Sequence, residues 1–281
     1  MCSEHAHAQT PRRTTASPWT FFPDKNLFPP LLAHYQEPRV GVRKQVGSAN
    51  LKLDIGSTLD FLEYSFAQDK KLRFGIDFFT YALTTTFEGA RLQVDAVDGF
   101  FGGHILFHTF SKRRAFSLRL RILHLSAHFV DGHYDLDDNV WIDGRGPIPF
   151  TRNFGELVGA YEWITPGVSL MLYSGLNYAP HVAPEGIQRL STIHGIQVHS
   201  DKLVSAVFGR PFNVFAADNF ILSGASTYAG TNNLEFGMKF GEWSGNGLKL
   251  YVSYYSGLDI FSQYFDVRRS NWGVGFAFDF W

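Results

Sequence analysis

Residues 115–130 read AFSLRLRILHLSAHFV, and this stretch decides the fold class. Its even positions from 116 to 122 are apolar, and after the phenylalanine they are Leu118, Leu120 and Ile122. Their alternation with serine and arginine is the two-residue period of a β-strand with one apolar face. Continued on the same parity, the apolar face ends in His124 and Ser126, a base beside a hydroxyl.

The same alternation recurs from Val40 to the last residues. With a short strand near Val40, the pattern predicts about twelve strands, separated by turns of Gly, Asn, Asp and Ser. Clear examples are residues 51–61, 71–78, 168–178, 233–240 and 272–280.

Composition narrows the class of protein. The chain has 281 residues and a formal net charge of -1, so nothing in it suggests a nucleic-acid partner. Cys2 is the only cysteine, which excludes an internal disulfide and a cysteine metal cluster. Aromatic residues make up 16%, charged residues only 18%, and no apolar run approaches the roughly 20 residues of a membrane helix. Such a chain fits a soluble β-sandwich or a membrane β-barrel.

The polar faces favour the barrel. They carry charges of both signs, as a narrow lumen crossed by ion pairs would, and the apolar faces are long and aromatic. We therefore predict an all-β fold, a closed antiparallel transmembrane barrel spanning residues 38–281 in the outer membrane. The side chains expected to point outward are Leu72, Phe74, Ile76, Leu118, Leu120, Phe276 and Phe278. Those expected to point inward are Arg73, Asp77, Arg119 and Arg121, and the carboxylates expected to pair with the last two arginines are Asp77, Asp95, Glu156 and Glu162.

Residues 1–37 differ from the rest. The opening MCSEHAHAQT has the A-x-A pattern of a signal-peptidase site without a preceding apolar region, so we expect the remnant of a secretory signal. A lipobox at Cys2 and a plain disordered terminus are the alternatives. Prolines at positions 24, 29, 30 and 38 exclude a regular helix or a central strand. We expect an extended periplasmic lead, packed at one end of the fold.

Two segments resemble a bacterial outer-membrane family catalogued as domain of unknown function twelve-oh-seven. The lead FFPDKNLFPPLLAHYQEPRVG is similar to that family's F-x-P…L-x-P-P…(D/E)-P-R-x-G opening. The strand LRILHLSAHFVDG resembles its R-x-R-x-x-H-x-S-S-H-x-G-D segment, with Ala127 and Val130 as departures. The resemblance covers most of residues 20–281 and implies a barrel in the envelope, with no established activity.

The His124–Ser126 pair is a candidate catalytic site. Residues two apart on one strand face have Cα atoms about 6.5 Å apart, so His124 can act as general base for Ser126. This H-x-S spacing is similar to that of the outer-membrane phospholipase A and lipid A deacylase barrels, which place both residues on the lipid-facing side. Those enzymes continue H-x-S-N, whereas this chain has Ala127. We expect Asn153, on the next strand, to lie across from His124 and orient it.

Alternatives to this site remain open. Asp138 and Asn139 are loop candidates for the orienting group, and the pair can also be read as ordinary polar residues at a strand's rim. The loop at 131–144 offers Asp135, Asp137 and Asp138 as oxygen ligands for Ca²⁺, although Val140 replaces the glycine of an EF-hand loop. A solvated acidic loop is the other interpretation, and we expect no further cofactor.

Three functions follow from the sequence. The first, which the sequence favours, is a structural or partner-binding barrel of the envelope. The second is a lipid-facing Ser-His acyl hydrolase of the phospholipase or lipid A deacylase type, and the third is a narrow passive channel. The expected partners are membrane lipids and, during insertion, the barrel-assembly machinery.

Overall fold

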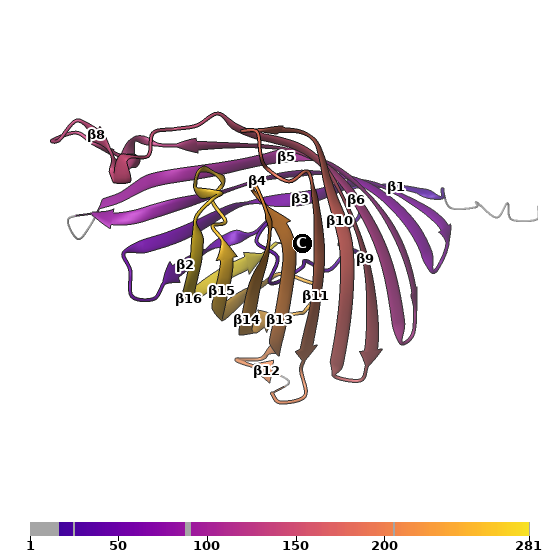
Figure 1. The fold of residues 1–281 in the computed structure, drawn as a ribbon. Coiled ribbons are helices and arrows are strands. Elements are labelled where there is room, and N and C mark those ends of the chain that lie inside the picture. Colours follow the sequence, from indigo (N-terminus) through magenta and orange to yellow (C-terminus); the bar gives the residue numbers. More distant parts are fainter. Residues whose placement is uncertain (1–16, 25, 88–90, 205, 281) are drawn as a thin grey trace, which may run out of the picture.

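The computed structural model describes residues 17–24, 26–87, 91–204 and 206–280. Twelve strands in these ranges form one closed antiparallel β-barrel, as predicted (Figure 1). No helix in the same ranges is long and apolar enough to cross a membrane. The expected signal remnant lies outside the described residues.

Each barrel strand pairs with the next in chain order, and the last pairs with the first. The twelve strands are β2 (Val40–Gln45), β3 (Asn50–Ala67), β4 (Lys70–Phe87), β5 (Arg91–Ser111), β6 (Arg114–Phe129), β9 (Phe150–Thr165), β10 (Val168–Ala183), β11 (Leu190–Ser200), β13 (Arg210–Gly224), β14 (Tyr228–Gly241), β15 (Gly247–Leu258) and β16 (Arg268–Asp279).

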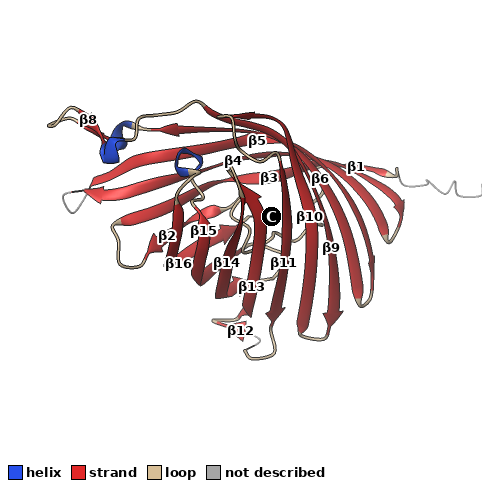
Figure 2. Cartoon of the chain, in the orientation of Figure 1, coloured by secondary structure: helices blue, strands red, loops and turns tan. Residues whose placement is uncertain are grey.

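Shorter elements decorate this ring (Figure 2). β1 (Trp19–Phe21) pairs with β3, and β12 (Ala206–Val207) pairs with β13. β7 (Tyr134–Asp135) and β8 (Val140–Trp141) form a separate hairpin. The 3-10 helices are η1 (Asp131–His133), η2 (Ile142–Gly144) and η3 (Ser262–Tyr264).

The two ends of the barrel differ. Two-residue turns join β3 to β4, β5 to β6 and β9 to β10 at the end where β2 begins and β16 ends; we name this the turn end. The opposite end carries the segments 130–149 and 259–267, and we name it the loop end. In bacterial outer-membrane barrels short turns lie in the periplasm and long loops outside the cell.

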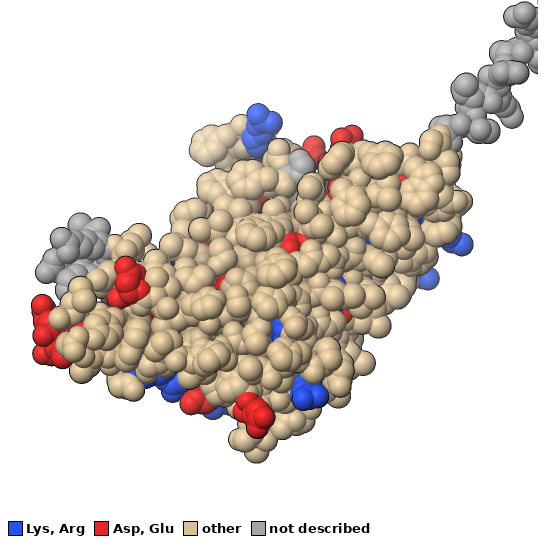
Figure 3. Space-filling model, turned by 90° about the horizontal axis from the view of Figure 1, so that it is seen from above, with Lys and Arg blue, Asp and Glu red and all other residues tan. Residues whose placement is uncertain are grey.

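The alternation predicted from the sequence sets the two faces of the wall. On β6, Leu118 and Leu120 are more than a third exposed, whereas Arg119 and Arg121 are buried in the lumen. The other residues predicted to point outward or inward lie as expected. Few charged side chains reach the surface on the face seen in Figure 3, and most of those lie near its edges. An apolar exterior and a charged interior are the reverse of a soluble protein and suit a bilayer.

The Pro-rich lead fills the lumen. Leu31, Leu32, Ala33 and His34 are each at most 3% exposed. Leu31 packs in a buried cluster with residues of β5, β9, β10, β11 and β13, while Leu32 and Ala33 pack against β13, β15 and β16. The sequence predicted that this lead packs at one end of the fold, but residues 28–37 lie inside the lumen, where the apolar side chains bury against the wall. The preceding strand β1 is exposed and pairs with β3 instead.

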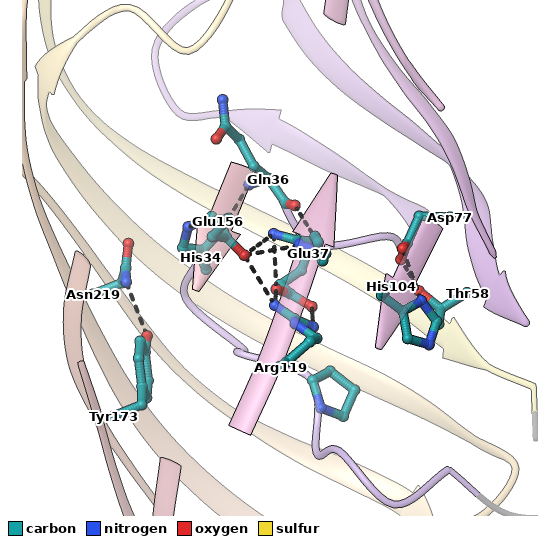
Figure 4. Close-up of polar contacts among 12 residues, drawn as sticks. His34, Gln36, Glu37, Thr58, Asp77, His104, Arg119, Glu156, Tyr173 and Asn219 are labelled. Carbon is teal, nitrogen blue, oxygen red and sulfur yellow. Dashed lines mark hydrogen bonds and ion pairs between the residues drawn. The ribbon is translucent and has the colours of Figure 1, made fainter. Parts of the chain in front are cut away.

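Buried ion pairs fasten the lead to the wall (Figure 4). Glu37 of the lead accepts hydrogen bonds from both terminal nitrogens of Arg119. Glu156 of β9 pairs with Arg121 at 2.7 Å and with Arg119 at 3.4 Å. Arg39 pairs with Glu235 of β14 at 3.0 Å. These three arginines are thus balanced by carboxylates, as buried charge requires.

The partners of Arg119 and Arg121 were predicted only in part. Glu156 pairs with both arginines as expected, but their second carboxylate is Glu37. The other three expected carboxylates have different partners: Asp77 binds His104 and Thr58, Asp95 binds His133 and Tyr264, and Glu162 binds Ser169.

Segment 259–267 folds into the loop end of the barrel. Phe261 and Tyr264 join an aromatic cluster of the upper lumen, and Gln263 donates to the carbonyl of Ala127 at 2.8 Å. We name segment 259–267 the loop cap. On its outer side, Asp266 accepts a 2.8 Å hydrogen bond from Arg145 of the other long loop, which lowers the pKa of the Asp266 carboxyl. The cap ties the two long loops together.

The filled lumen predicts little ion conductance. Full-length protein in planar bilayers is expected to show no stable open level, because the lead occupies the bore. Replacing residues 26–36 with a Gly-Ser linker of equal length removes the buried leucines but keeps Glu37 and Arg39, and is expected to give open levels. Single-channel recording checks this, and a wild-type conductance equal to that of the linker variant would contradict it.

Candidate functional site

His124 and Ser126 lie on the outer face of the wall, near the loop end of β6. They continue the row of Leu118, Leu120 and Ile122, and both are partly exposed, whereas Leu123, Leu125 and Ala127 between and beside them are buried in the lumen. Counting alternate residues along the strand is enough to predict this outward placement, because no bulge interrupts β6.

Asn153 lies directly across from His124. The two residues are register partners between β6 and β9, as the sequence predicted. His124 Nδ1 is 2.6 Å from Asn153 Oδ1. A carbonyl oxygen only accepts hydrogen bonds, so Nδ1 carries the proton and Nε2 is left with a free lone pair. This is the tautomer that a general base facing a hydroxyl requires.

Ser126 completes the cluster without touching His124. No hydrogen bond joins the two side chains among the described residues, although their spacing puts their Cα atoms only about 6.5 Å apart. Rotation about the side-chain bonds closes this gap, and catalytic hydrogen bonds commonly tighten only when substrate binds. The ring of Phe101 lies 4.9 Å from that of His124 and limits its movement on the other side.

Two glycines keep the surface low around the site. Gly99 is the register partner of Ser126 on β5, and Gly155 follows Asn153 on the outer face of β9. A Cβ at either position would meet only one backbone oxygen, at 3.9 Å. By contrast, a Cβ at Gly102 would come within 2.0 Å of a carbonyl oxygen. Packing therefore requires glycine at Gly102 but not at Gly99 or Gly155.

The height of the site matches the upper edge of an apolar band. Outward aromatic pairs mark the two edges, Tyr161 with Trp163 toward the turn end and Tyr254 with Trp272 toward the loop end. Ser126 lies about a dozen residues along β6 from the turn, and at the usual tilt each residue rises about 2.5 Å, so the site lies near the top of a band roughly 25 Å tall.

The acidic loop does not gather a metal site. Asp135 accepts hydrogen bonds from the backbone N–H groups of Asp137 and Asp138, at 3.0 and 3.2 Å, which is a turn that needs no ion. No group of three or more His, Cys, Asp or Glu side chains suited to a metal occurs within the described ranges. Asn139 accepts from Tyr134, and neither it nor Asp138 is bonded to His124.

The sequence missed two polar groups. His104 lies in the lumen between Asp60 and Asp77, at 2.8 and 2.9 Å. On the outer wall, Ser174 and His194 are paired across β10 and β11 and hydrogen-bond at 3.0 Å. Strand parity places each residue on a face, but only the register brings the partners together.

Comparison with known proteins identifies neither a family nor a function for this chain. No family model matches the chain, so its resemblance to domain of unknown function twelve-oh-seven is not confirmed. No curated protein matches it either. Solved structures that it resembles include the CymD monoaromatic hydrocarbon channel, with a TM-score of 0.46 and 6% identity over 84% of this chain and 75% of that one.

Two others have lower TM-scores. OmpT, an outer membrane protein of Vibrio cholerae, is 10% identical over 86% of this chain and 95% of that one, with a TM-score of 0.38. LpxR from Salmonella typhimurium is 12% identical over 86% of this chain and 98% of that one, with a TM-score of 0.39. At these scores the likenesses set no expectation for function. The chain is a closed twelve-stranded β-barrel that carries a Ser, His and Asn cluster on its outer wall.

Proposed function

We propose that the protein is an outer-membrane acyl hydrolase, which cleaves ester-linked acyl chains of outer-leaflet lipids with Ser126 as nucleophile, His124 as base and Asn153 as orienting group. The observation that carries the proposal is the 2.6 Å hydrogen bond from His124 to Asn153 on the outer face. A histidine held in one tautomer beside a serine is the arrangement that activates a hydroxyl.

The reaction is a two-step acyl transfer. Ser126 Oγ attacks the ester carbonyl while its proton passes to His124 Nε2, and that proton then leaves with the departing alkoxide of the lipid. Water then attacks the acyl-serine while its proton passes to the same nitrogen; the bond from the acyl carbon to Ser126 Oγ breaks, Oγ takes that proton back, and a free fatty acid is released. Asn153 keeps Nε2 directed at the hydroxyl through both steps and stabilises the protonated ring.

The location supports lipid as the substrate. Polar groups on the lipid side of a barrel raise its free energy in the membrane, so those that occur there usually have a function. We expect this cluster to lie at the height where the ester linkages of the outer leaflet meet the headgroups. Such a placement assumes that the turn end is periplasmic, as the short turns and even strand number indicate. Phe280 is exposed and follows the outward Phe276 and Phe278, and it is the residue that we expect the barrel-assembly machinery to recognise.

Covalent labelling tests the proposal directly. Purified protein in mixed micelles is expected to release fatty acid from phospholipid or lipid A and to be labelled at Ser126 by a lipid-like fluorophosphonate. Ser126→Ala is expected to lose both the label and the activity, while Ser174→Ala, the other outward serine beside a histidine, keeps them. Unlabelled, inactive wild-type protein would refute the hydrolase.

A structural barrel is the second candidate, because the filled lumen and the loop cap describe a rigid body without an open pore. It predicts no labelling at Ser126 and no released fatty acid in any of these variants. The same experiment therefore separates the two functions.

The low surface at Gly155 predicts a chain-length effect. Gly155 lies between Ile122 and Tyr178, its register partners on either side, so a leucine there would fill the space that the missing side chain leaves open beside Asn153. Gly155→Leu is expected to raise KM for long-chain esters about tenfold and to leave a short, soluble ester unaffected, since a missing hydrophobic contact is worth about 1–3 kcal/mol. Ala82→Leu, outward on β4, is the matched control; equal effects on both substrates would contradict the prediction.

A further inference from the structure

A second group of polar side chains lies on the outer wall, within the apolar band. It consists of Ser174 on β10, Thr192 and His194 on β11, Asp218 on β13 and Asn232 on β14, and we name it the lateral patch. Hydrogen bonds join its members in two sets: His194 contacts Ser174 at 3.0 Å and Thr192 at 3.2 Å, and Asn232 donates to Asp218 at 2.6 Å.

Apolar residues flank this patch along β10 and β13. On β13, outward Val214 and Ala216 lie on the turn side of Asp218, and Phe220 and Leu222 lie on its loop side. On β10, Leu172 and Leu176 flank Ser174 in the same way, and both are more than 40% exposed. Ser174, His194 and Asp218 therefore lie below the upper edge of the band, whereas Asn232, the register partner of Ser256, lies at about the height of the aromatic pair that marks this edge.

An acidic side chain in this position needs a partner. Asp218 Oδ1 accepts from Asn232, but Oδ2 has no hydrogen-bond partner among the described residues. A carboxylate that faces hydrocarbon is unfavourable, and such residues in membrane proteins usually pair with another polar group. Asp218 points away from the lumen, so the buried cations of the lumen cannot serve as its partner.

We propose that the lateral patch is the interface between two copies of this chain, related by a two-fold axis along the membrane normal. Charge complementarity is the reason for proposing a second copy of the chain as the partner. A two-fold interface brings residue i of one copy against residue j of the other and j against i, so it needs an acid and a base side by side at one height. His194 and Asp218 meet this requirement.

The register shows that their heights agree. Following paired residues from Leu118 on β6 across the sheet leads to Ser270 on β16, so each step to the next strand climbs toward the loop end. One such step, from His194 to its partner Phe220, rises about 3 Å, and the two residues back to Asp218 descend about 5 Å. His194 and Asp218 therefore lie within about 2 Å of the same height on neighbouring strands.

In the pair, His194 of each copy meets the free carboxylate oxygen of Asp218 in the other. The imidazole exchanges its weak contact with Thr192 for a charge-assisted hydrogen bond, and the leucines and Phe220 around the patch close over it. Ile196 is the register partner of Asp218. In the dimer it lies close to the two-fold axis, where it faces Ile196 of the other copy.

Cross-linking tests this geometry. In a Cys2→Ser background, Ile196→Cys is expected to form a disulfide-linked dimer on mild oxidation in liposomes. Ile105→Cys is the matched control on β5, since the two isoleucines are 42% and 43% exposed and both point outward. It is expected to stay monomeric. Equal cross-linking at both positions would overturn the proposal, because random collision in the bilayer gives that result.

A charge exchange tests the pairing. Analytical ultracentrifugation of wild-type protein in detergent is expected to show dimers. Asp218→Leu and His194→Leu are each expected to weaken dimerisation at least tenfold, with folding checked by heat-modifiable gel migration. The exchanged chain, His194→Asp with Asp218→His, is expected to recover affinity to within about threefold of the wild type.

Two results would overturn the proposal. One is a wild-type chain that stays monomeric at all protein-to-detergent ratios, even if it cross-links to a different protein in cells. The other is a dimer that persists unchanged in the Asp218→Leu variant. Neither result bears on hydrolysis, which uses other residues.

Discussion

Replacing His124 with alanine is expected to lower the rate of lipid ester hydrolysis by about three to four orders of magnitude. The serine hydroxyl is a poor nucleophile unless its proton is removed as it attacks, and His124 is the base on the outer face that spacing places within reach. Because the serine and the histidine act as one unit, the double variant with Ser126→Ala is expected to be no slower than either single variant.

Variants of Asn153 separate orientation from chemistry. Asn153→Asp keeps an oxygen acceptor at 2.6 Å from Nδ1 and is expected to retain activity, whereas Asn153→Leu removes the acceptor and is expected to lower kcat with little change in KM. Release of fatty acid at saturating substrate measures this. An Asn153→Leu variant as active as Asn153→Asp would show that the hydrogen bond does not position the base.

Glu156→Ala is expected to destabilise the barrel by about 3–5 kcal/mol, because it removes one of the two carboxylates that balance Arg119 and Arg121 and leaves a positive charge buried without compensation. Glu156 is fully buried, so water cannot replace it. Urea titration of protein reconstituted in lipid, followed by tryptophan fluorescence, measures the free energy of unfolding.

Glu162→Ala provides the matched control. Glu162 lies on the same strand and face, but its side chain is hydrogen-bonded only to Ser169 among the described residues, so its loss is expected to cost about 1 kcal/mol. Similar losses for the two variants would mean that the ion pairs of the lumen contribute no more than single neutral hydrogen bonds.

Strand parity explains why the wall could be predicted from the sequence. A residue on a barrel strand faces either lipid or lumen, and the alternation around Leu118 and Arg119 states which. The same reasoning predicted that His124 and Ser126 point outward. It also predicted that Asn153 lies opposite His124, because only some registers of two neighbouring antiparallel strands keep the apolar residues of both strands on the lipid side.

The contents of the lumen could not be predicted in the same way. The lead has no period, because its prolines prevent a regular strand, so nothing in the sequence said where its leucines would be buried. Glu37 was for that reason overlooked as the partner of Arg119. Pairs such as Asp60 with His104 depend on a register across two strands and a bulge near Asp60, which alternation does not encode.

The lateral patch illustrates the same limit on the outer face. Asp218 reads as an ordinary polar residue within the segment FAADNF, and its outward orientation can be predicted only when the start of its strand is known. Its importance emerges only when the paired strands show Ser174, His194 and Asn232 around it.

The shortness of β2 determines how the barrel would come apart under load. This strand has six residues, against eighteen in β4, and it closes the ring against β16. Tension applied between the two ends of the chain would peel β2 from β16 one hydrogen bond at a time. Before that low-force step, β1 must leave β3, and the anchors of Glu37 and Arg39 in the lumen must break. A force-extension trace should therefore show the sharp rupture of these anchors first and a gradual unzipping after it.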